Sequence, residues 1–379
     1  LRLLTTATPG AQGDREEDRP ATHPLTIVPV LDRVSPPPAL RPIRIGPVTV
    51  PVPLALAPMA GATNLPYRML CRRFGAGLTV TEMVSAKALS FRDGKTWALL
   101  ERNPLEDPLS AQVFGTVPAE MAEAARAIEG AGFHAVDVNM GCPVPKIAGS
   151  GAGCSLMKDP RDAAAVIEAM ARAVSIPVTV KMRAGWDEQR RNAPEVARAV
   201  ASAGAAAVTV HGRTRAQLYS GRADLAIIAE VKRSVPIPVL GNGDVDSPAK
   251  ALRMFRETGC DGIVIGRGAL GTPWIFRDIL EVLRTGVAPP PPGAEEVRDH
   301  LLHLARDLAR LRGEYTGIRL MRKLSCDFAK GFRDGGRFRE SAVRIETLAD
   351  LETLARAFFT PERLRTQAPG GEPSRTAAA

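Results

Sequence analysis

The sequence is poor in aromatic residues and has no long apolar run. Phe, Trp and Tyr make up only 4% of its 379 residues, which argues against a surface built for stacking, such as a carbohydrate-binding face. No apolar stretch approaches the roughly 20 residues that a membrane-spanning helix needs, so we expect no membrane partner. Hydrophobic residues still make up 45% of the chain, which is enough for a large core and excludes wholesale disorder.

Cysteines are few as well, and no two of them have a paired spacing such as CxxC. The five are Cys71, Cys142, Cys154, Cys260 and Cys326. An odd number of separated cysteines fits free thiols in a reducing compartment, and the N-terminal stretch has no apolar segment of a secretory signal. We therefore expect a cytoplasmic protein. No cluster of His, Cys and carboxylate residues has metal-ligand spacing, so we expect no metal.

Basic residues outnumber acidic ones, 50 to 41, which gives a formal net charge of +9. The excess is concentrated between Arg298 and Arg339, where 11 basic residues face five acidic ones. Such a concentration favours a polyanionic partner, and nucleic acid is the first candidate. A solvated helix face in an arginine-rich chain is the competing interpretation.

Proline-rich stretches divide the chain. Residues 1–42 hold eight prolines without any periodic pattern, and we expect a disordered tail there. Residues 287–294 contain four consecutive prolines, which favour a stiff linker. Helical spacing follows over 295–366, as in the stripe of Leu301, Leu304 and Leu308. The last residues, 367–379, again lack any pattern and are expected to be disordered.

The segment 43–286 alternates short apolar runs with helix-like segments. The runs lie at 54–58, 78–82, 109–114, 135–139, 177–182, 206–211, 237–242 and 261–266. Strands that alternate with helices predict right-handed crossovers and a parallel sheet. Eight such units in one segment predict an α/β fold, a closed (β/α)8 TIM barrel, followed by a C-terminal all-α helical domain.

Barrel enzymes carry their active site on the loops that follow the strands. Six of the predicted strand ends present a polar side chain, and two of the loops are rich in glycine. The loops are Gly241-Asn242-Gly243-Asp244, after the seventh strand, and Gly266-Arg267-Gly268, after the eighth. Glycine lets a backbone expose its N–H groups to a ligand, and these two loops often hold a phosphate. The plainer interpretation is that the glycines only make tight turns.

Lys181 and Cys142 are the most informative single residues. Lys181 interrupts an apolar strand, where it either reaches the rim as a structural residue or stabilises an anion at the strand end. Cys142 lies in a Gly-Cys-Pro loop after the fourth strand and so faces the mouth of the barrel. A cysteine is more often a small buried hydrophobe, but a thiol in this place can act as an acid.

These residues stand in motifs that resemble the tRNA-dihydrouridine synthases, with the bacterial branch of the family nearest. The resemblance covers roughly residues 43–360. Its motifs are APMAGATNLPYR (57–68), AGLTVTEMVSA (76–86), Gln112, DVNMGCPVPKI (137–147), VKMRAGW (180–186), TVHGRTRAQLYSG (209–221), PVLGNGD (238–244) and GIVIGRGALGTPWIF (262–276). They occur in the family's order and at matching intervals.

The resemblance implies an FMN enzyme that reduces a uridine of tRNA to 5,6-dihydrouridine, with NADPH as reductant. Hydride would pass from flavin N5 to C6 of uracil, and the thiol of Cys142 would protonate C5. The family's pattern assigns the cofactor to Pro58, Met59, Ala60, Gln112, Lys181, His211, Asn242, Gly243, Asp244, Gly266 and Arg267. Asn139 and Arg183 are candidates for binding the uracil. The segment with Arg319, Arg322 and Lys323 resembles the family's tRNA-binding helix. A monomer is expected.

Two other functions remain open from the sequence. A barrel that acts on a free pyrimidine, like the dihydroorotate or dihydropyrimidine dehydrogenases, would share the fold, the flavin loops and a cysteine acid. It would not explain the basic helical domain. A non-catalytic RNA-binding protein would explain that domain, but it would have no use for Cys142, Lys181 and the glycine loops.

Overall fold

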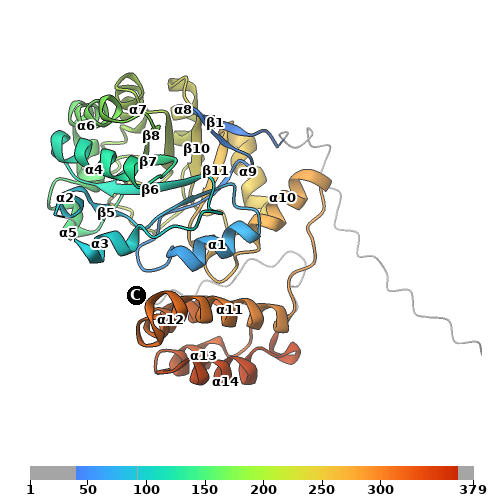
Figure 1. The fold of residues 1–379 in the computed structure, drawn as a ribbon. Helices are drawn as coiled ribbons and strands as arrows, with labels where there is room; N and C mark the ends of the chain where they lie inside the picture. The colour runs from blue at the N-terminus through green and yellow to red at the C-terminus, as the bar shows by residue number, and fades with distance from the viewer. Residues whose placement is uncertain (1–39, 92, 366–379) are drawn as a thin grey trace, which may run out of the picture. The chain divides into compact units, whose positions relative to one another are not determined.

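The structure is a computed structural model that describes residues 40–91 and 93–365 (Figure 1). The predicted tails, 1–42 and 367–379, therefore lie outside the described residues except for 40–42. Among the described residues, no helix is both long and apolar enough to cross a membrane.

Eight parallel strand positions close into a barrel, with the second position split into two short strands. The strands are β3 (Leu54–Leu56), β4 (Leu78–Val80) with β5 (Val84–Ser85), β6 (Leu109–Phe114), β7 (Ala135–Met140), β8 (Val178–Arg183), β9 (Ala207–His211), β10 (Val239–Asn242) and β11 (Gly262–Ile265). Their hydrogen-bonded order runs β4-β3-β11-β10-β9-β8-β7-β6, and β4 also pairs with β6. That last pairing closes the ring, so the predicted barrel is confirmed.

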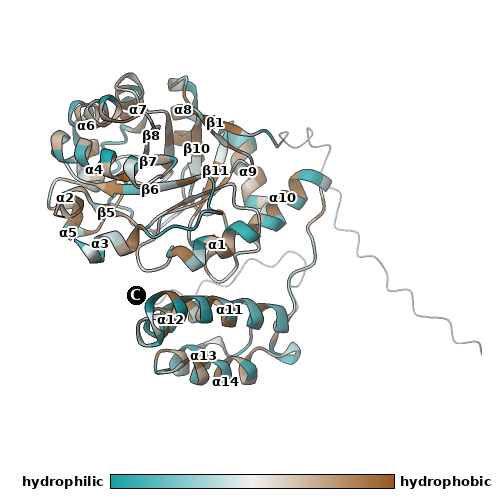
Figure 2. Cartoon of the chain, in the orientation of Figure 1, coloured by the Kyte–Doolittle hydropathy of each residue, from teal (hydrophilic) through white to brown (hydrophobic). Residues whose placement is uncertain are grey.

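Helices follow the strands and cover the outside of the barrel (Figure 1). They are α1 (Leu65–Arg73), α2 (Ala86–Ser90), α3 (Gly94–Leu99), α4 (Pro118–Gly130), α5 (Pro145–Ala148), α6 (Pro160–Ala173), α7 (Ala193–Ser202), α8 (Leu225–Ser234), α9 (Pro248–Thr258) and α10 (Ile275–Thr285), with single turns η1 (Gly153–Lys158) and η2 (Arg267–Ala269). Several of these helices begin with proline, because the backbone N–H groups of the first helical turn have no partner within the helix. In Figure 2 hydrophilic and hydrophobic residues alternate along helices such as α10.

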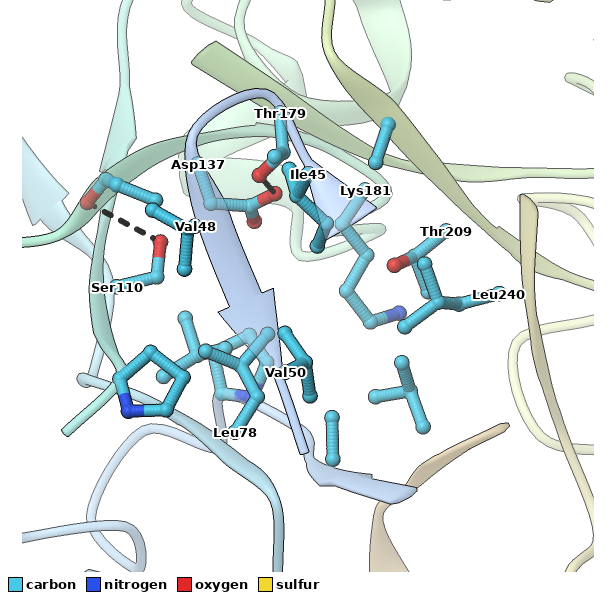
Figure 3. Close-up of a pocket in the computed structure, with 17 residues that line it drawn as sticks. Ile45, Val48, Val50, Leu78, Ser110, Asp137, Thr179, Lys181, Thr209 and Leu240 are labelled. Atoms are coloured by element: carbon cyan, nitrogen blue, oxygen red, sulfur yellow. Dashed lines mark hydrogen bonds between the residues drawn. The ribbon is translucent and has the colours of Figure 1, made fainter. Parts of the chain in front are cut away.

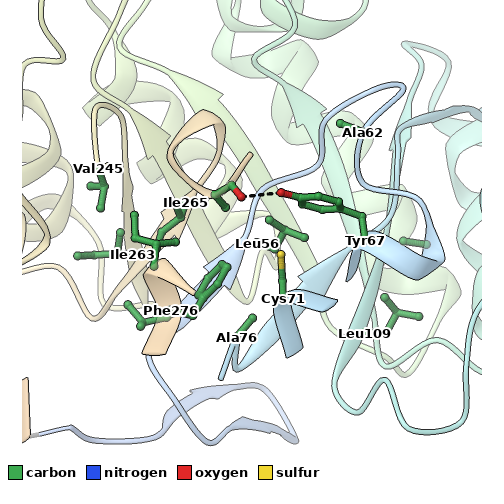
Figure 4. Packing of buried hydrophobic residues seen from close by; sticks show 14 of the residues in the cluster. Leu56, Ala62, Tyr67, Cys71, Ala76, Leu109, Val245, Ile263, Ile265 and Phe276 are labelled. Atoms are coloured by element: carbon green, nitrogen blue, oxygen red, sulfur yellow. Dashed lines mark hydrogen bonds between the residues drawn. The ribbon is translucent and has the colours of Figure 1, made fainter. Parts of the chain in front are cut away.

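Alternation along each strand separates two layers of core. On β8, Val178, Val180 and Met182 pack outward against the helices, whereas Thr179 and Lys181 line the interior of the barrel. The outer layer is the larger of the two, and Figure 4 shows part of it, where residues such as Ile263 and Phe276 pack between strand and helix. This period of two places every second residue of a strand end inside the mouth.

A hairpin that the sequence analysis did not predict closes the amino end of the barrel. Strands β1 (Ile43–Ile45) and β2 (Val48–Val50) pair antiparallel around Gly46, whose φ of +57° suits glycine. Ile43, Ile45 and Val50 are buried in one cluster with inward residues of the barrel strands, among them Leu240. The hairpin thereby seals the interior from below and leaves the carboxyl end as the entrance.

The segment after the barrel is helical. It contains α11 (Ala294–Arg312), α12 (Glu314–Phe328), α13 (Gly335–Ala342), α14 (Leu348–Phe358) and the turn η3 (Pro361–Arg363). The predicted leucine stripe, Leu301, Leu304 and Leu308, is fully buried. Within this segment Phe359 packs edge to face against Phe332, Phe338 and Phe358, and all four belong to the main core cluster.

Helices α11 and α12 contact barrel residues directly. The guanidinium of Arg312 donates to Glu101 at 3.0 Å. Gly271 lies against the backbone of α12 so closely that a Cβ there would sit 2.1 Å from the carbonyl oxygen of Asp327. Only glycine permits that approach, so the loop after β11 is shaped to receive α12.

Candidate active site at the carboxyl end of the barrel

The strand ends bring the predicted polar side chains together at the mouth of the barrel. In the parallel pairing, Asn139 of β7 lies opposite Lys181 of β8, and Arg183 of β8 lies opposite His211 of β9. His211 pairs in turn with Asn242 of β10. Residues two apart on a strand face the same side, so the row that holds Asn139 and Lys181 and the row that holds Arg183, His211 and Asn242 together line the mouth as a ring.

Lys181 points into the barrel and is held by an amide. Its Nζ donates to Asn242 Oδ1 at 3.0 Å, while Asn242 Nδ2 donates to the carbonyl of Val264 at 2.6 Å. Figure 3 shows the Lys181 side chain inside a cavity of about 30 Å³ that it shares with Asp137 and Thr179. Burial, and then the charge of Arg183, lower the pKa of Lys181 from 10.5 to about 8. The ammonium is therefore expensive to hold there, which favours an anion-binding role over a structural one.

Gln112 and Asn139 share a chain of hydrogen bonds below the loop that carries Cys142. Gln112 Nε2 donates to Asp137 Oδ2 at 2.7 Å, and Asn139 Nδ2 donates to Gln112 Oε1 at 2.8 Å. Asn139 Oδ1 accepts the backbone N–H groups of Gly141 and Cys142 at 3.1 and 2.9 Å. Asn139, a candidate for binding uracil, thus also fixes this loop.

Cys142 is partly exposed, whereas the neighbouring Cys154 is fully buried. The backbone N–H of Cys154 donates to the carbonyl of Cys142 at 3.2 Å, so the two residues lie side by side. Burial raises the pKa of the Cys154 thiol to about 12. Of the two thiols near the mouth, Cys142 is the one that a ligand can reach.

Arg183 links two loops of the mouth. Its Nε donates to the carbonyl of Gly141 at 2.9 Å, and its Nη1 donates to the carbonyls of Thr214 and Leu218 at 2.9 and 2.8 Å. The guanidinium is buried and lies 5.5 Å from the ring of Tyr219. Arg183, a candidate for binding the uracil, therefore braces the Cys142 loop against the loop after β9.

His211 is neutral at physiological pH. Burial, followed by the positive charges of Lys181, Arg183 and Arg213, lowers the pKa of His211 to about 2. The convergence of these cations on one imidazole shows how electropositive the mouth is. An anionic ligand would relieve that repulsion.

An Arg213–Asp244 ion pair, which the sequence analysis missed, holds the glycine loop after β10. Arg213 donates to both carboxylate oxygens of Asp244, at 2.7 and 2.8 Å. Asp244 has a φ of +54° and also accepts the N–H of Ala223 at 2.8 Å. The arginine falls two residues after His211, just beyond the end of β9, so the continued period of two was the available signal.

The glycine loops expose backbone donors. Within residues 40–91 and 93–365, no acceptor contacts the backbone N–H of Gly243 or of Gly266. Arg267 is 55% exposed beside them, 4.0 Å from Asp244, and its guanidinium lies over the ring of Tyr219 at 4.4 Å. Unpaired N–H groups next to a half-exposed guanidinium suit a phosphate.

The loop after β3 is braced from below. Met59 N–H donates to Thr63 Oγ1 at 2.9 Å, and the N–H of Gly61 donates to Glu82 Oε2 at 2.5 Å. Burial raises the pKa of Glu82, which the sequence analysis did not single out as a site residue. Pro58 and Met59 are partly exposed and Ala60 is exposed, so the three offer a mostly apolar edge to the mouth.

Comparison with known proteins identifies this arrangement. The family model described as Dihydrouridine synthase matches residues 55–361, from the first barrel strand to the turn after α14. The chain belongs to the dihydrouridine synthase family. Its sequence-based assignment to that family is thereby confirmed, and with it the class of an oxidoreductase.

Curated relatives match most of the chain. A tRNA-dihydrouridine synthase B of Xanthomonas campestris pv. campestris is 43% identical over 317 residues, which are 84% of this chain and 96% of the relative. A tRNA-dihydrouridine synthase B of Pseudomonas aeruginosa is 45% identical over 281 residues, 74% of this chain and 85% of the relative.

In this dihydrouridine synthase the three predicted basic residues of α12 differ in their surroundings. Arg322 is partly buried and donates through Nε to the carbonyl of Ile345 at 2.9 Å. Arg319 and Lys323 are exposed one turn apart, and Arg319 donates to the hydroxyl of Tyr315 at 3.0 Å. The exposed pair is thus free to contact a ligand, whereas Arg322 also holds α12 against the turn before α14.

Proposed function

We propose that this dihydrouridine synthase reduces a uridine of tRNA to 5,6-dihydrouridine, with FMN as cofactor and NADPH as reductant. The observation that carries the proposal is the mouth itself. An accessible thiol, Cys142, lies on a loop fixed at the rim of a ring that holds Lys181, Arg213 and Arg267. The relatives named as tRNA-dihydrouridine synthases support the substrate.

The residues present fit FMN. The unpaired N–H groups of Gly243 and Gly266, with Arg267, suit its phosphate. Gln112 Nε2 and Oε1 each keep one hydrogen-bonding position after their protein contacts, so they can serve the polar edge of a flavin. When bound, FMN would supply the hydride for C6 of uracil.

The protein's own groups complete the reduction. Addition of hydride at C6 places negative charge on C5 and O4 of the uracil, and a proton at C5 neutralises it. The thiol of Cys142 supplies that proton in the proposal. Lys181 opposes negative charge on the cofactor from inside the barrel, where burial strengthens its field.

The tRNA contacts are proposed for the exposed basic residues of α12. Arg319 and Lys323 lie on one exposed face and would neutralise phosphates of the tRNA backbone. The uridine must leave its stack to reach the mouth, at a cost of a few kcal/mol that backbone contacts offset. A tRNA substrate also places the enzyme in the cytoplasm.

Turnover of two matched cysteine variants tests the proposal. Cys142→Ala is expected to keep its FMN but to lose most formation of dihydrouridine, because the acid is gone. Cys326→Ala removes another partly exposed thiol, on α12, and is expected to keep turnover. Near-normal turnover of Cys142→Ala would remove the thiol from the mechanism. Reduction of free uracil without reduction of tRNA would favour a small-pyrimidine enzyme.

Replacing Arg319 and Lys323 together by alanine tests the nucleic-acid face. We expect weaker tRNA binding and a salt dependence whose slope is reduced by about two, since each lost phosphate contact removes about one unit. An unchanged slope would place the tRNA elsewhere on the protein.

A further inference from the structure

Asp137 is a buried carboxylate at the centre of β7 that has no role in the proposed reaction. Its side chain lines the interior cavity beside Lys181 (Figure 3). Oδ1 accepts the hydroxyl of Thr179 at 2.6 Å, and Oδ2 accepts Gln112 Nε2 at 2.7 Å. Burial raises the pKa of Asp137, and the two hydrogen bonds oppose that rise. Both oxygens are therefore occupied by specific donors.

The carboxylate sets the direction of the chain of amides above it. An ionised carboxylate only accepts, so it can face only the NH2 end of Gln112. The Oε1 end of Gln112 then faces the opposite way and takes Nδ2 of Asn139 at 2.8 Å. That bond leaves Asn139 Oδ1 turned toward the N–H groups of Gly141 and Cys142. Each amide has one donor end and one acceptor end, so the acceptor at Asp137 and the backbone donors of the loop are satisfied by one orientation of the chain, in which Asn139 Nδ2 also donates to Met83 Sδ at 3.4 Å.

We propose that Asp137 is a positioning residue that holds the Cys142 loop in place through Gln112 and Asn139. The inference deepens the proposed function, because it rests on Cys142 as the acid. Other contacts of the loop act through carbonyls, those of Gly141 and Cys142, which accept from Arg183 and Cys154. Asn139 alone among the described residues accepts the two backbone N–H groups.

A second effect of Asp137 must be separated from this one. Its charge also acts on Lys181, whose pKa it raises against the effect of burial. The isosteric change Asp137→Asn removes the charge but keeps an acceptor for Gln112, because the Thr179 hydroxyl can turn to accept the new NH2 group. Asp137→Ala removes both the charge and the acceptor.

Amide hydrogen exchange of the peptide that contains Gly141 and Cys142 tests the proposal, in purified protein without tRNA or NADPH. In Asp137→Ala, Gln112 is free to turn, and we expect exchange to accelerate about tenfold or more, since a misdirected buried amide loses its partners. Asp137→Asn should stay within about threefold of the wild type. The control Thr179→Val removes the other donor to the same carboxylate, outside the chain of amides, and should change the exchange about twofold at most.

Peptide-resolved alkylation of Cys142 by iodoacetamide gives a second readout of the loop. Its rate should change in Asp137→Ala and not in Asp137→Asn or Thr179→Val. Unaltered exchange in Asp137→Ala would overturn the proposal. Equally accelerated exchange in Thr179→Val would also overturn it, because it would indicate a general loosening of the structure. Equally accelerated exchange in Asp137→Asn would overturn it as well, because it would indicate an effect of the charge.

A measurement on the wild type keeps the test valid if Asp137→Ala does not fold. The side-chain NH2 protons of Gln112 and Asn139 should exchange much more slowly than those of exposed amides, because both groups are buried and bonded. Exchange as fast as that of an exposed glutamine would contradict the fixed chain. None of these readouts uses the reaction, so a failed uridine assay would leave the positioning result standing.

Discussion

The Arg213–Asp244 pair allows the most quantitative test of how the mouth is built. We consider Asp244→Asn, which keeps the shape of the side chain and tolerates the φ of +54° as well as aspartate does. The change removes the charge that faces Arg213, whose side chain is only 3% exposed. In the aspartate, Arg213 and Ala223 donate to a carboxylate oxygen. In the asparagine, an NH2 group can take the place of that oxygen, so that two donors face each other.

The magnitude follows from the burial of the two partners. Removing one partner of a buried ion pair costs about 3–5 kcal/mol, because the other charge is left without a counter-charge. Asp244 is 33% exposed, so water can replace part of the loss and we expect about 3 kcal/mol. The nearby Asp246–Lys250 pair is about half exposed on both sides, and Asp246→Asn should cost only about 0–1 kcal/mol.

Urea unfolding of the two variants at pH 7, without FMN, measures the difference. An Asp244→Asn protein no less stable than Asp246→Asn would refute the reasoning about burial. The pH dependence gives a second check. Burial would raise the pKa of Asp244, but the hydrogen bonds from Arg213 and Ala223 prevail and lower it. Its stabilisation is therefore complete above the unfolded pKa of about 4 and is lost as the pH falls through the folded value.

Three further outcomes are expected. Glu106→Gln should cost about 3–5 kcal/mol in urea unfolding, because Arg68 and Glu106 are both fully buried with 2.8 Å between Nε and Oε1; a cost below 1 kcal/mol would contradict this. The pKa of Lys181 is about 8 in the folded protein, below its ordinary value of 10.5. Between pH 8 and 10.5 the unfolded chain therefore binds more protons at Lys181 than the folded protein does, and the contribution of Lys181 to stability rises with pH in that window. Lys181→Met should abolish that rise in the free energy of unfolding, a change on the order of 3 kcal/mol relative to the wild type. Parallel curves of unfolding free energy against pH for the two proteins would contradict the lowered pKa. Gly243→Ala should give flavin-poor protein by absorbance, since its φ is +125° and a Cβ would lie 2.6 Å from that of Ala223, and a full flavin load would place the phosphate elsewhere.

The barrel was predictable because its strands are buried on both faces. Such strands appear in the sequence as short continuous apolar runs, and all eight runs became strands within a few residues. The hairpin of residues 43–50 was not predictable in the same way. Its strands are three residues long, and each presents only one face to the core. The hairpin is buried only because it covers the amino end of the barrel, and that end is formed by residues far away in the sequence.

The ring of polar residues was predictable in outline. A residue such as Lys181 or His211 at the end of an apolar run must face either the mouth or the helices, and period-two alternation indicates which. Contacts between strands were not predictable. Asp137 stands in the run AVDVN, and its partners come from 25 residues earlier and 42 residues later in the chain. Arg183 likewise has a motif position, but its carbonyl partners belong to a loop whose path the sequence leaves open.

Mass-spectrometric nucleoside analysis of tRNA tests the central claim most directly. The purified protein is incubated with FMN, NADPH and tRNA that contains unmodified uridine, and the nucleosides are compared with those from a Cys142→Ala reaction. We expect a uridine that gains two hydrogens with the wild type and not with the variant. A yellow protein that oxidises NADPH yet leaves every uridine of the tRNA unchanged would contradict it.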